Sequence, residues 1–179
     1  MPKIELPPLP WPEDALDLVR QAVFLQEVAH PEIGYELGGD TGAPITIAVD
    51  RHQFGQAMTN VLKNAAEAIE ARHRDADLDY RGRIAVTLTT LDDFLSVAVE
   101  DNGIGLPQDR ERIVEPYVTT REKGTGLGLA IVNKIVEEHG GEMIFTARAE
   151  GGTRVELRFA RDPVGSPAHT HIEPAMRDT

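Results

Sequence analysis

The sequence predicts a two-layer α/β sandwich in which a mixed β-sheet carries its helices on one face. Three segments have apolar residues at helical spacing, and pairs of strand-like segments lie between them. That order does not give the strict strand-helix-strand units of a doubly wound parallel sheet. With 179 residues, one domain can bury about two-thirds of the surface that its unfolded chain exposes.

Composition excludes several classes of protein. The chain has no cysteine, so it has neither a disulfide framework nor a thiolate zinc site, which suits a reducing cytoplasm. No apolar run approaches the roughly 20 residues that span a bilayer. A net charge of -12 argues against nucleic acid, because phosphate-backbone binding needs clustered Lys and Arg. We therefore expect contact with neither nucleic acid nor a membrane.

The first part of the chain predicts a connector, a helix and two strands. Residues 1–12 are rich in proline, which favours an extended connector. Residues 13–28 have helical periodicity, and His30 followed by proline ends that helix. Short strands at 33–37 and 45–49 flank several glycines and predict a hairpin.

A long helix follows, with Asp50 as its expected N-cap and an end near residue 73. One face of this helix is apolar and comprises Phe54, Met58, Val61, Leu62, Ala65 and Ile69. The opposite face is polar and comprises Gln56, Asn60, Lys63, Asn64 and Glu67.

The rest of the chain predicts two strand pairs separated by a loop and a helix. The expected elements are strands at 83–91 and 94–100, an irregular segment at 101–125, a helix at 126–139, strands at 142–147 and 153–159, and a disordered tail at 162–179. Gly140 and Gly141 stop the helix.

Asn60 and Asn64 form the first segment whose residue types suggest a chemical function. Four residues apart on a helix, their side chains stack one turn from each other. Asparagine carbonyls are neutral oxygen ligands that suit magnesium when phosphates supply the negative charge. By itself, the pair is also typical of a solvated helix face.

The second segment begins at Asp101, directly after a strand, and continues through Gly103 and Gly105. A carboxylate at a strand end, followed by alternating glycines, places a fixed acceptor beside backbone that a flat ring can approach closely. An adenine amino group is a suitable donor. A tight turn capped by aspartate is the alternative.

The third segment, at residues 124–130, opens a helix with three glycines. Such a start exposes backbone N–H groups and the positive end of the helix dipole, which together favour phosphate. The polar residues before it exclude a Rossmann turn, and no Gly-Lys-Ser or Gly-Lys-Thr of a P-loop is present. Arg121 and Lys123 supply the local positive potential that an acidic chain needs to hold a polyanion.

In this order and spacing, the segments resemble the N, G1, F and G2 boxes of the sensor histidine kinase catalytic domain, part of the wider family of gyrase B, Hsp90 and MutL. The matching stretches are 60–65, 101–105, 116–120 and 124–128. The resemblance covers about residues 11–161 and implies a Bergerat-type ATP-binding fold for residues 13–161. Tyr117 stands where the F box usually has phenylalanine, a mild change at a packing position.

A finer resemblance concerns residues 20–26 and 29–31. These stretches look like the nitrogen-regulation sensor kinases of the NtrY type.

The resemblance implies ATP and Mg²⁺ as ligands. Asp101 would bind the adenine amino group, and Asn64 would coordinate the metal with Asn60 supporting it. Residues 107–123 would form a mobile lid. The other residues implied to contact ATP are Lys63, Gly103, Gly105, Thr119, Thr120, Arg121, Lys123, Gly124, Thr125, Gly126, Leu127, Gly128 and Leu129.

The same resemblance implies transfer of the γ-phosphate to a histidine on a dimerisation domain, and from there to a response regulator. None of the six histidines has the His-Glu or His-Asp context of that acceptor, and we expect all six to be structural or solvated. His139, near a helix C-terminus, favours a partial positive charge there. Residues 1–12 would connect to a missing dimerisation domain, so this fragment should not autophosphorylate alone. It would be cytoplasmic, with a parent kinase anchored in the inner membrane.

Two other functions remain open. ATPases of the gyrase and Hsp90 kind carry a glutamate base one helical turn before the magnesium-binding asparagine. Asn60 occupies that place here and cannot take a proton, while Glu67 lies about one turn to the other side of Asn64. The same substitution disfavours an anti-sigma-factor serine kinase. A regulatory module that binds ATP without transferring it stays possible, because the acceptor is absent.

Overall fold

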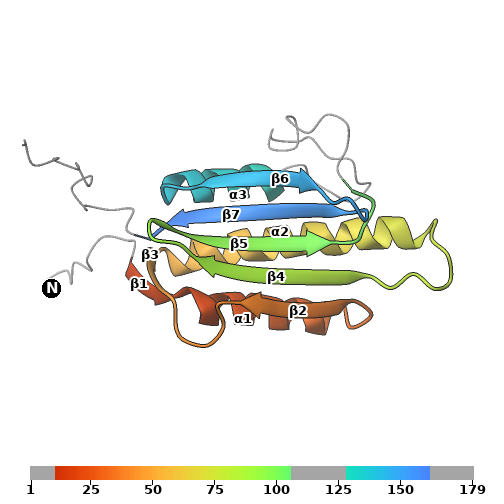
Figure 1. Cartoon of the computed structure of the whole chain (residues 1–179), viewed down its shortest axis with the longest axis horizontal. Helices are drawn as coiled ribbons and strands as arrows, with labels where there is room; N and C mark the ends of the chain where they lie inside the picture. The colour runs from red at the N-terminus through yellow and green to blue at the C-terminus, as the bar shows by residue number, and fades with distance from the viewer. Residues whose placement is uncertain (1–10, 106–127, 162–179) are drawn as a thin grey trace, which may run out of the picture.

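The computed structural model describes residues 11–105 and 128–161. A five-stranded mixed sheet in the order β2-β4-β5-β7-β6 forms one layer, and the helices cover one of its faces (Figure 1). The sequence therefore predicted the two-layer sandwich correctly. The elements are β1 (Trp11–Asp14), α1 (Ala15–Ala29), β2 (Gly34–Gly39), β3 (Thr46–Val49), α2 (Arg51–His73), β4 (Arg83–Thr90), β5 (Phe94–Asp101), α3 (Gly128–Glu138), β6 (Glu142–Ala147) and β7 (Thr153–Ala160).

The core lies between the sheet and α2. All six residues of the predicted apolar face of α2 are buried, and α2 packs against β4 and β5 of the sheet. The rings of Phe54 and Phe159 lie 4.9 Å apart between their centroids. Asp50 caps α2 as predicted, because its Oδ1 accepts a hydrogen bond of 3.1 Å from the N–H of Gln53.

The start of the described chain differs from the expected connector. Residues 11 and 12 belong to β1, which pairs antiparallel with β3 in a separate two-stranded sheet. Proline is tolerated in β1 because this strand has a neighbour on one side only. Asp14 then caps α1, since its Oδ1 accepts from the N–H groups of Leu16 (3.1 Å) and Ile45 (3.0 Å). The helix therefore begins at Ala15, two residues later than predicted.

The hairpin predicted from residues 33–37 and 45–49 is wrong. β2 pairs parallel with β4, whereas β3 pairs with β1. Gly39 has a φ of 83°, and a side chain there would collide with the carbonyl of Leu88. Asp40 continues this contact, because its N–H donates to Leu88 O (2.9 Å) and its carboxylate accepts from the N–H of Thr90 (2.7 Å). These bonds hold the end of β2 against β4 instead of turning it back onto β3.

The second half of the described chain matches its prediction closely. β4 and β5 form the expected antiparallel hairpin, and β6 and β7 form the other strand pair. The part of α3 that is described ends at Glu138, before Gly140 with its φ of 71°. The expected lid at 107–123 and tail at 162–179 lie outside the described residues.

His139 has a structural role, as expected. Its side chain is buried, with Nδ1 2.7 Å from the carbonyl oxygen of Ile135 and Nε2 3.1 Å from the backbone nitrogen of Asp50. Nε2 accepts the hydrogen bond from the N–H of Asp50, which leaves Nδ1 as the ring nitrogen that can donate to Ile135. His139 thus joins the end of α3 to the start of α2.

The sheet face away from the helices is polar. Glu156 accepts hydrogen bonds from Ser96 Oγ (2.6 Å) and Arg158 Nε (3.3 Å), and Arg154 pairs with Glu100 at 3.5 Å. Among the described helices, none is long and apolar enough to cross a bilayer.

Candidate functional site

Asn60 and Asn64 lie on the rim of α2, between its core face and solvent. Both are half-buried, whereas Gln56 and Lys63 on the same polar side are exposed. Glu67 is also half-buried. Both asparagines, like Glu67, thus have partly shielded positions.

The Asp101 segment sits directly on α2. Asp101 is the last residue of β5, is 4% exposed, and accepts a hydrogen bond of 2.8 Å from the N–H of Gly103. The next N–H, that of Ile104, donates to the carbonyl of Ala68 at 3.1 Å. A Cβ at Gly103 would lie 2.5 Å from the carbonyl carbon of Ala68. Glycine is therefore required for the loop to lie this close to the helix.

This contact brings the first two predicted segments together. Ala68 follows Asn64 by four residues, so it lies on the same side of α2, about 6 Å further along the helix axis. The Asp101 loop therefore lies one turn from Asn64 and two turns from Asn60. The loop that follows the buried carboxylate of Asp101 thus contacts the helix that carries the two asparagines.

The third segment is described only in part. Gly128 and Leu129 form the first turn of the described α3 and are half-buried, and an added Cβ at Gly128 would meet nothing within 4 Å. The remaining predicted ATP contacts lie outside the described residues: Thr119, Thr120, Arg121, Lys123, Gly124, Thr125, Gly126 and Leu127.

Sequence reasoning missed the residues that hold the outer side of the Asp101 loop. The carbonyl of Asn102 accepts from Arg72 Nη1 at 2.6 Å and from Tyr80 Oη at 2.9 Å. Arg148 Nη1 donates to the carbonyl of Asp101 at 2.9 Å. Of these residues, only Arg72 could have been found from the sequence, because it continues the series of every fourth residue on α2 that starts at Asn60.

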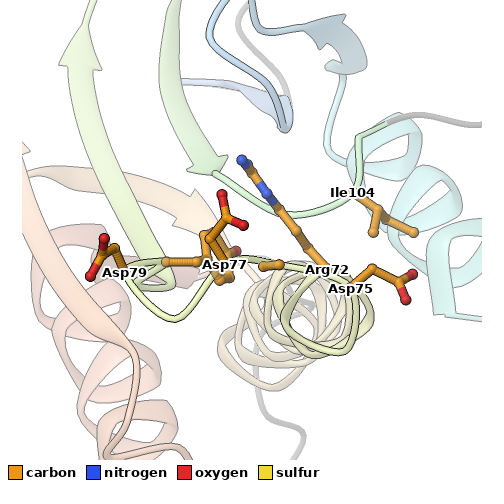
Figure 2. Close-up of a pocket in the computed structure, with 7 residues that line it drawn as sticks. Arg72, Asp75, Asp77, Asp79 and Ile104 are labelled. Atoms are coloured by element: carbon orange, nitrogen blue, oxygen red, sulfur yellow. The ribbon is translucent and has the colours of Figure 1, made fainter.

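A hollow of about 470 Å³ opens beside this outer side. Figure 2 shows Arg72 extending from the end of α2 toward the end of β5, with Asp77 and Asp79 on the loop after the helix. The lining residues are Arg72, Asp75, Ala76, Asp77, Asp79, Tyr80 and Ile104. None of them belongs to the predicted set of ATP contacts, but Ile104 lies between Gly103 and Gly105, which do.

The site residues fit a magnesium ion that a nucleotide brings with it. Asn64 offers an amide oxygen, a neutral ligand that suits Mg²⁺ when phosphate oxygens complete the shell. Among residues 11–105 and 128–161, one group of His and carboxylate side chains has metal-ligand spacing, formed by His30, Glu32 and Glu70. Glu70 follows Asn64 by six residues and so points to another side of α2. That group is separate from the candidate site.

Comparison with known families decides the classification. Residues 49–163 match the family described as "Histidine kinase-, DNA gyrase B-, and HSP90-like ATPase". The chain belongs to this family. The match includes α2, β5 and α3, so Asn60, Asn64 and Asp101 all lie inside it.

The relatives within this family are sensor kinases. The chain is 48% identical to nitrogen regulation protein NtrY of Azorhizobium caulinodans over 87% of its own length and 20% of the relative. It is 38% identical to a putative NtrY-like sensor histidine kinase of Rickettsia conorii over 79% of its length and 22% of the relative. The chain thus spans about a fifth of these relatives. The NtrY-type resemblance of residues 20–31 is confirmed.

Solved structures of the family have the same fold. The mycobacterial sensor histidine kinase MprB superimposes with a TM-score of 0.72 at 26% identity, over 87% of this chain and 99% of that one. The catalytic domain of histidine kinase ThkA gives a TM-score of 0.72 at 28% identity, over 86% and 98%. The chain is therefore an ATP-binding catalytic domain of the histidine kinase type.

Proposed function

We propose that this chain holds Mg-ATP and transfers the γ-phosphate to a histidine on the dimerisation domain of a sensor kinase, from which a response regulator receives it. The observation that carries the proposal is the seating of the Asp101 loop on Ala68, one helical turn from Asn64. We place this domain in the cytoplasm, where ATP and response regulators are found, and expect the whole kinase to be anchored in the inner membrane.

Each side chain has a distinct role in this proposal. Asp101 accepts a hydrogen bond from the adenine amino group, and its bond to the Gly103 N–H fixes the direction of the carboxylate. Asn64 is the magnesium ligand, Asn60 supports it, and Lys63 stands beside them with its exposed cation. The bound ion neutralises charge on the phosphates. Gly105, Gly128, Leu129 and the contacts predicted within 119–127 complete the nucleotide site.

Transfer to histidine is favoured over hydrolysis by the residue at position 60. A glutamate there could accept a proton from water, but the amide of Asn60 cannot. Glu67 is half-buried three residues after Asn64, on the other side from the position that a base would occupy. Water is therefore a poor competitor for the γ-phosphate.

The test is radiolabelled ATP with three samples: the chain alone, the chain with the dimerisation fragment of Azorhizobium NtrY, and the chain with that fragment carrying alanine at its acceptor histidine. We expect acid-labile label only on the intact acceptor. Label on the chain alone, or none on the acceptor at saturating ATP, would contradict the kinase assignment. The second result, with ATP still bound, would support a regulatory module.

One exposed surface suits docking of the histidine-bearing helices. Phe24, Leu25 and Val28 on α1 are 61%, 62% and 66% exposed. Contiguous exposed apolar side chains on a domain mark an interaction surface, and an amphipathic helix is a suitable partner for a helix face. In the same assay, Phe24→Ser should reduce transfer and leave ATP binding unchanged. Leu78→Ser is the control, because Leu78 is 96% exposed and lies on the loop between α2 and β4. Equal effects of the two changes would reject this surface.

A further inference from the structure

We propose that Arg72, Tyr80, Asn102 and Arg148 form a clamp that positions the Asp101 carboxylate, and that this clamp helps the site select adenine over guanine. The inference rests on the proposed adenine contact of Asp101. Arg72, Tyr80 and Arg148 bond to the carbonyls of Asp101 and Asn102, and we give all four residues a positioning role without contact to nucleotide.

Asn102 is the centre of the clamp, because both its side chain and its carbonyl are bonded. Its Oδ1 accepts from the N–H of Arg83 at 2.8 Å, and its Nδ2 donates to the carbonyl of Arg81 at 2.8 Å. Its carbonyl accepts from Arg72 and Tyr80, as described above. These bonds attach the loop after β5 to the start of β4 and to the end of α2.

Arg72 and Tyr80 also support each other. The guanidinium carbon of Arg72 lies 4.6 Å from the centroid of the Tyr80 ring, a cation-π arrangement. Burial raises the pKa of the Tyr80 hydroxyl; the charge of Arg72 opposes this rise and the charge of Asp101 adds to it. The net rise keeps the hydroxyl protonated, so that it remains a donor to Asn102. Figure 2 shows Arg72 reaching across the hollow toward the end of β5.

The main-chain carbonyl of Asp101 is also held in place, by Arg148 and Gly152. Arg148 donates to this carbonyl at 2.9 Å from the turn between β6 and β7. Gly152 approaches the same carbonyl so closely that a Cβ there would overlap it, and its φ is 95°. The carbonyls of Asp101 and Asn102 are thus bonded by two arginines from two different elements. The carboxylate between them is left with little freedom to turn.

The helix that carries the clamp also carries the asparagines. Arg72 lies eight residues after Asn64, which is about 12 Å along α2, and Ala68 contacts the loop between them. One rigid element thus sets the distance between the magnesium ligand and the adenine acceptor. A fixed carboxylate stabilises bound adenine by accepting a hydrogen bond from its amino group. It repels the carbonyl oxygen that guanine presents at the same position. A carboxylate that can turn discriminates less.

The experiment measures dissociation constants of Mg-ATP and Mg-GTP by calorimetry for this chain and its variants. We expect Arg72→Ala and Asn102→Ala to raise the ATP constant about threefold to tenfold, the effect of one or two hydrogen bonds. GTP binding should change little, so the ATP to GTP preference falls. Arg72→Lys keeps one donor and should recover part of the preference. Arg74→Ala, which removes an exposed arginine at the end of the same helix, should change nothing.

A double-mutant cycle with Asp101→Ala separates positioning from general stability. If Arg72 acts through Asp101, Arg72→Ala should cost no further ATP affinity once the carboxylate is gone. Additive losses, or an unchanged ATP to GTP preference in folded Arg72→Ala and Arg72→Lys, would overturn the clamp while leaving the adenine role of Asp101 intact. Unchanged ATP affinity in Asp101→Ala alone would overturn the proposed function itself. Thermal melting of each variant identifies those that are folded.

Discussion

The carboxylate of Asp101 accepts a 2.8 Å hydrogen bond from the backbone N–H of Gly103, and Gly103 lies against Ala68 of α2 with no room for a side chain. This relationship ties the end of β5 to the helix that carries both site asparagines. The candidate nucleotide site depends on the closeness of this contact.

Replacing Gly103 by alanine should therefore impair the site. The new methyl group would lie 2.5 Å from the backbone of Ala68, so the loop must move away and carry Asp101 with it. We expect a loss of about 1–3 kcal/mol of stability and about tenfold weaker ATP binding. Gly55→Ala is the control, because an added Cβ there meets nothing within 4 Å and alanine favours a helix. Equal behaviour of the two variants in chemical denaturation and calorimetry would refute the packing argument.

Asn64→Ala should separate the magnesium contact from the adenine contact. Loss of the amide oxygen should weaken Mg-ATP about tenfold or more and leave adenosine binding unchanged, because adenosine brings no phosphate and no metal. Gln56→Ala, an exposed position two turns earlier on α2, should change neither. Calorimetry with both ligands checks this, and parallel losses for ATP and adenosine would show that Asn64 has a structural role instead.

His139→Ala should destabilise the fold without touching the nucleotide site. It leaves the partly buried N–H of Asp50 without its acceptor and removes the bond to Ile135. We expect a loss of about 2–4 kcal/mol in the free energy of unfolding, measured by urea denaturation. His52→Ala, at an exposed position on the first turn of α2, should stay within about 0.5 kcal/mol of the wild type. A His139 variant of wild-type stability would contradict the stabilising role of these two hydrogen bonds.

The polar sheet face away from the helices should make the free energy of unfolding depend on pH. Burial alone would raise the pKa of Glu156, but hydrogen bonds from Ser96 and Arg158, with the charges of Arg158 and Arg154, lower it below its ordinary value of 4.5. A carboxyl with a lowered folded pKa stabilises the fold fully above its unfolded value, and this stabilisation is lost as pH falls through the folded value.

Glu156→Gln tests the direction of this pH dependence. The difference in unfolding free energy between wild type and variant should be about 1–3 kcal/mol near pH 7 and should shrink as pH falls below 4.5. Urea titrations at several pH values measure it, with the exposed Glu27→Gln as the control. A difference that stayed constant or grew toward low pH would contradict the assignment.

The local elements could be predicted from sequence because their signals are local. The Asp50 cap, the apolar stripe of α2 and the β4-β5 hairpin each depend on residues within one element or one turn. The pairing of β2 depended on a contact between Gly39 and Leu88, about fifty residues apart, and strand proximity in sequence favoured the wrong partner. The β1 strand was missed for a similar reason, since its proline is acceptable only because no further strand joins that edge.

In the candidate site, too, residues with local signals could be predicted from the sequence, and residues that act through distant contacts could not. Motif spacing identified Asn60, Asn64 and Asp101, because each residue type has a recognisable chemistry in its segment. It could not identify Arg72, Tyr80 or Arg148, whose functional partners are backbone carbonyls of the Asp101 loop. Every residue has a backbone carbonyl, so the sequence does not show which carbonyl accepts a side-chain hydrogen bond. Such supporting residues can be identified only from the folded structure.

The central claim, that Asp101 recognises adenine in a magnesium-dependent nucleotide site, is tested most directly by calorimetry of this chain and Asp101→Ala with ATP and GTP, each with Mg²⁺ or with EDTA. We expect the wild type to prefer ATP, to need Mg²⁺ for full affinity, and to lose about tenfold to a hundredfold in ATP affinity in Asp101→Ala. Equal binding of ATP and GTP by the wild type, or an Asp101→Ala variant with wild-type affinity for ATP, would contradict it.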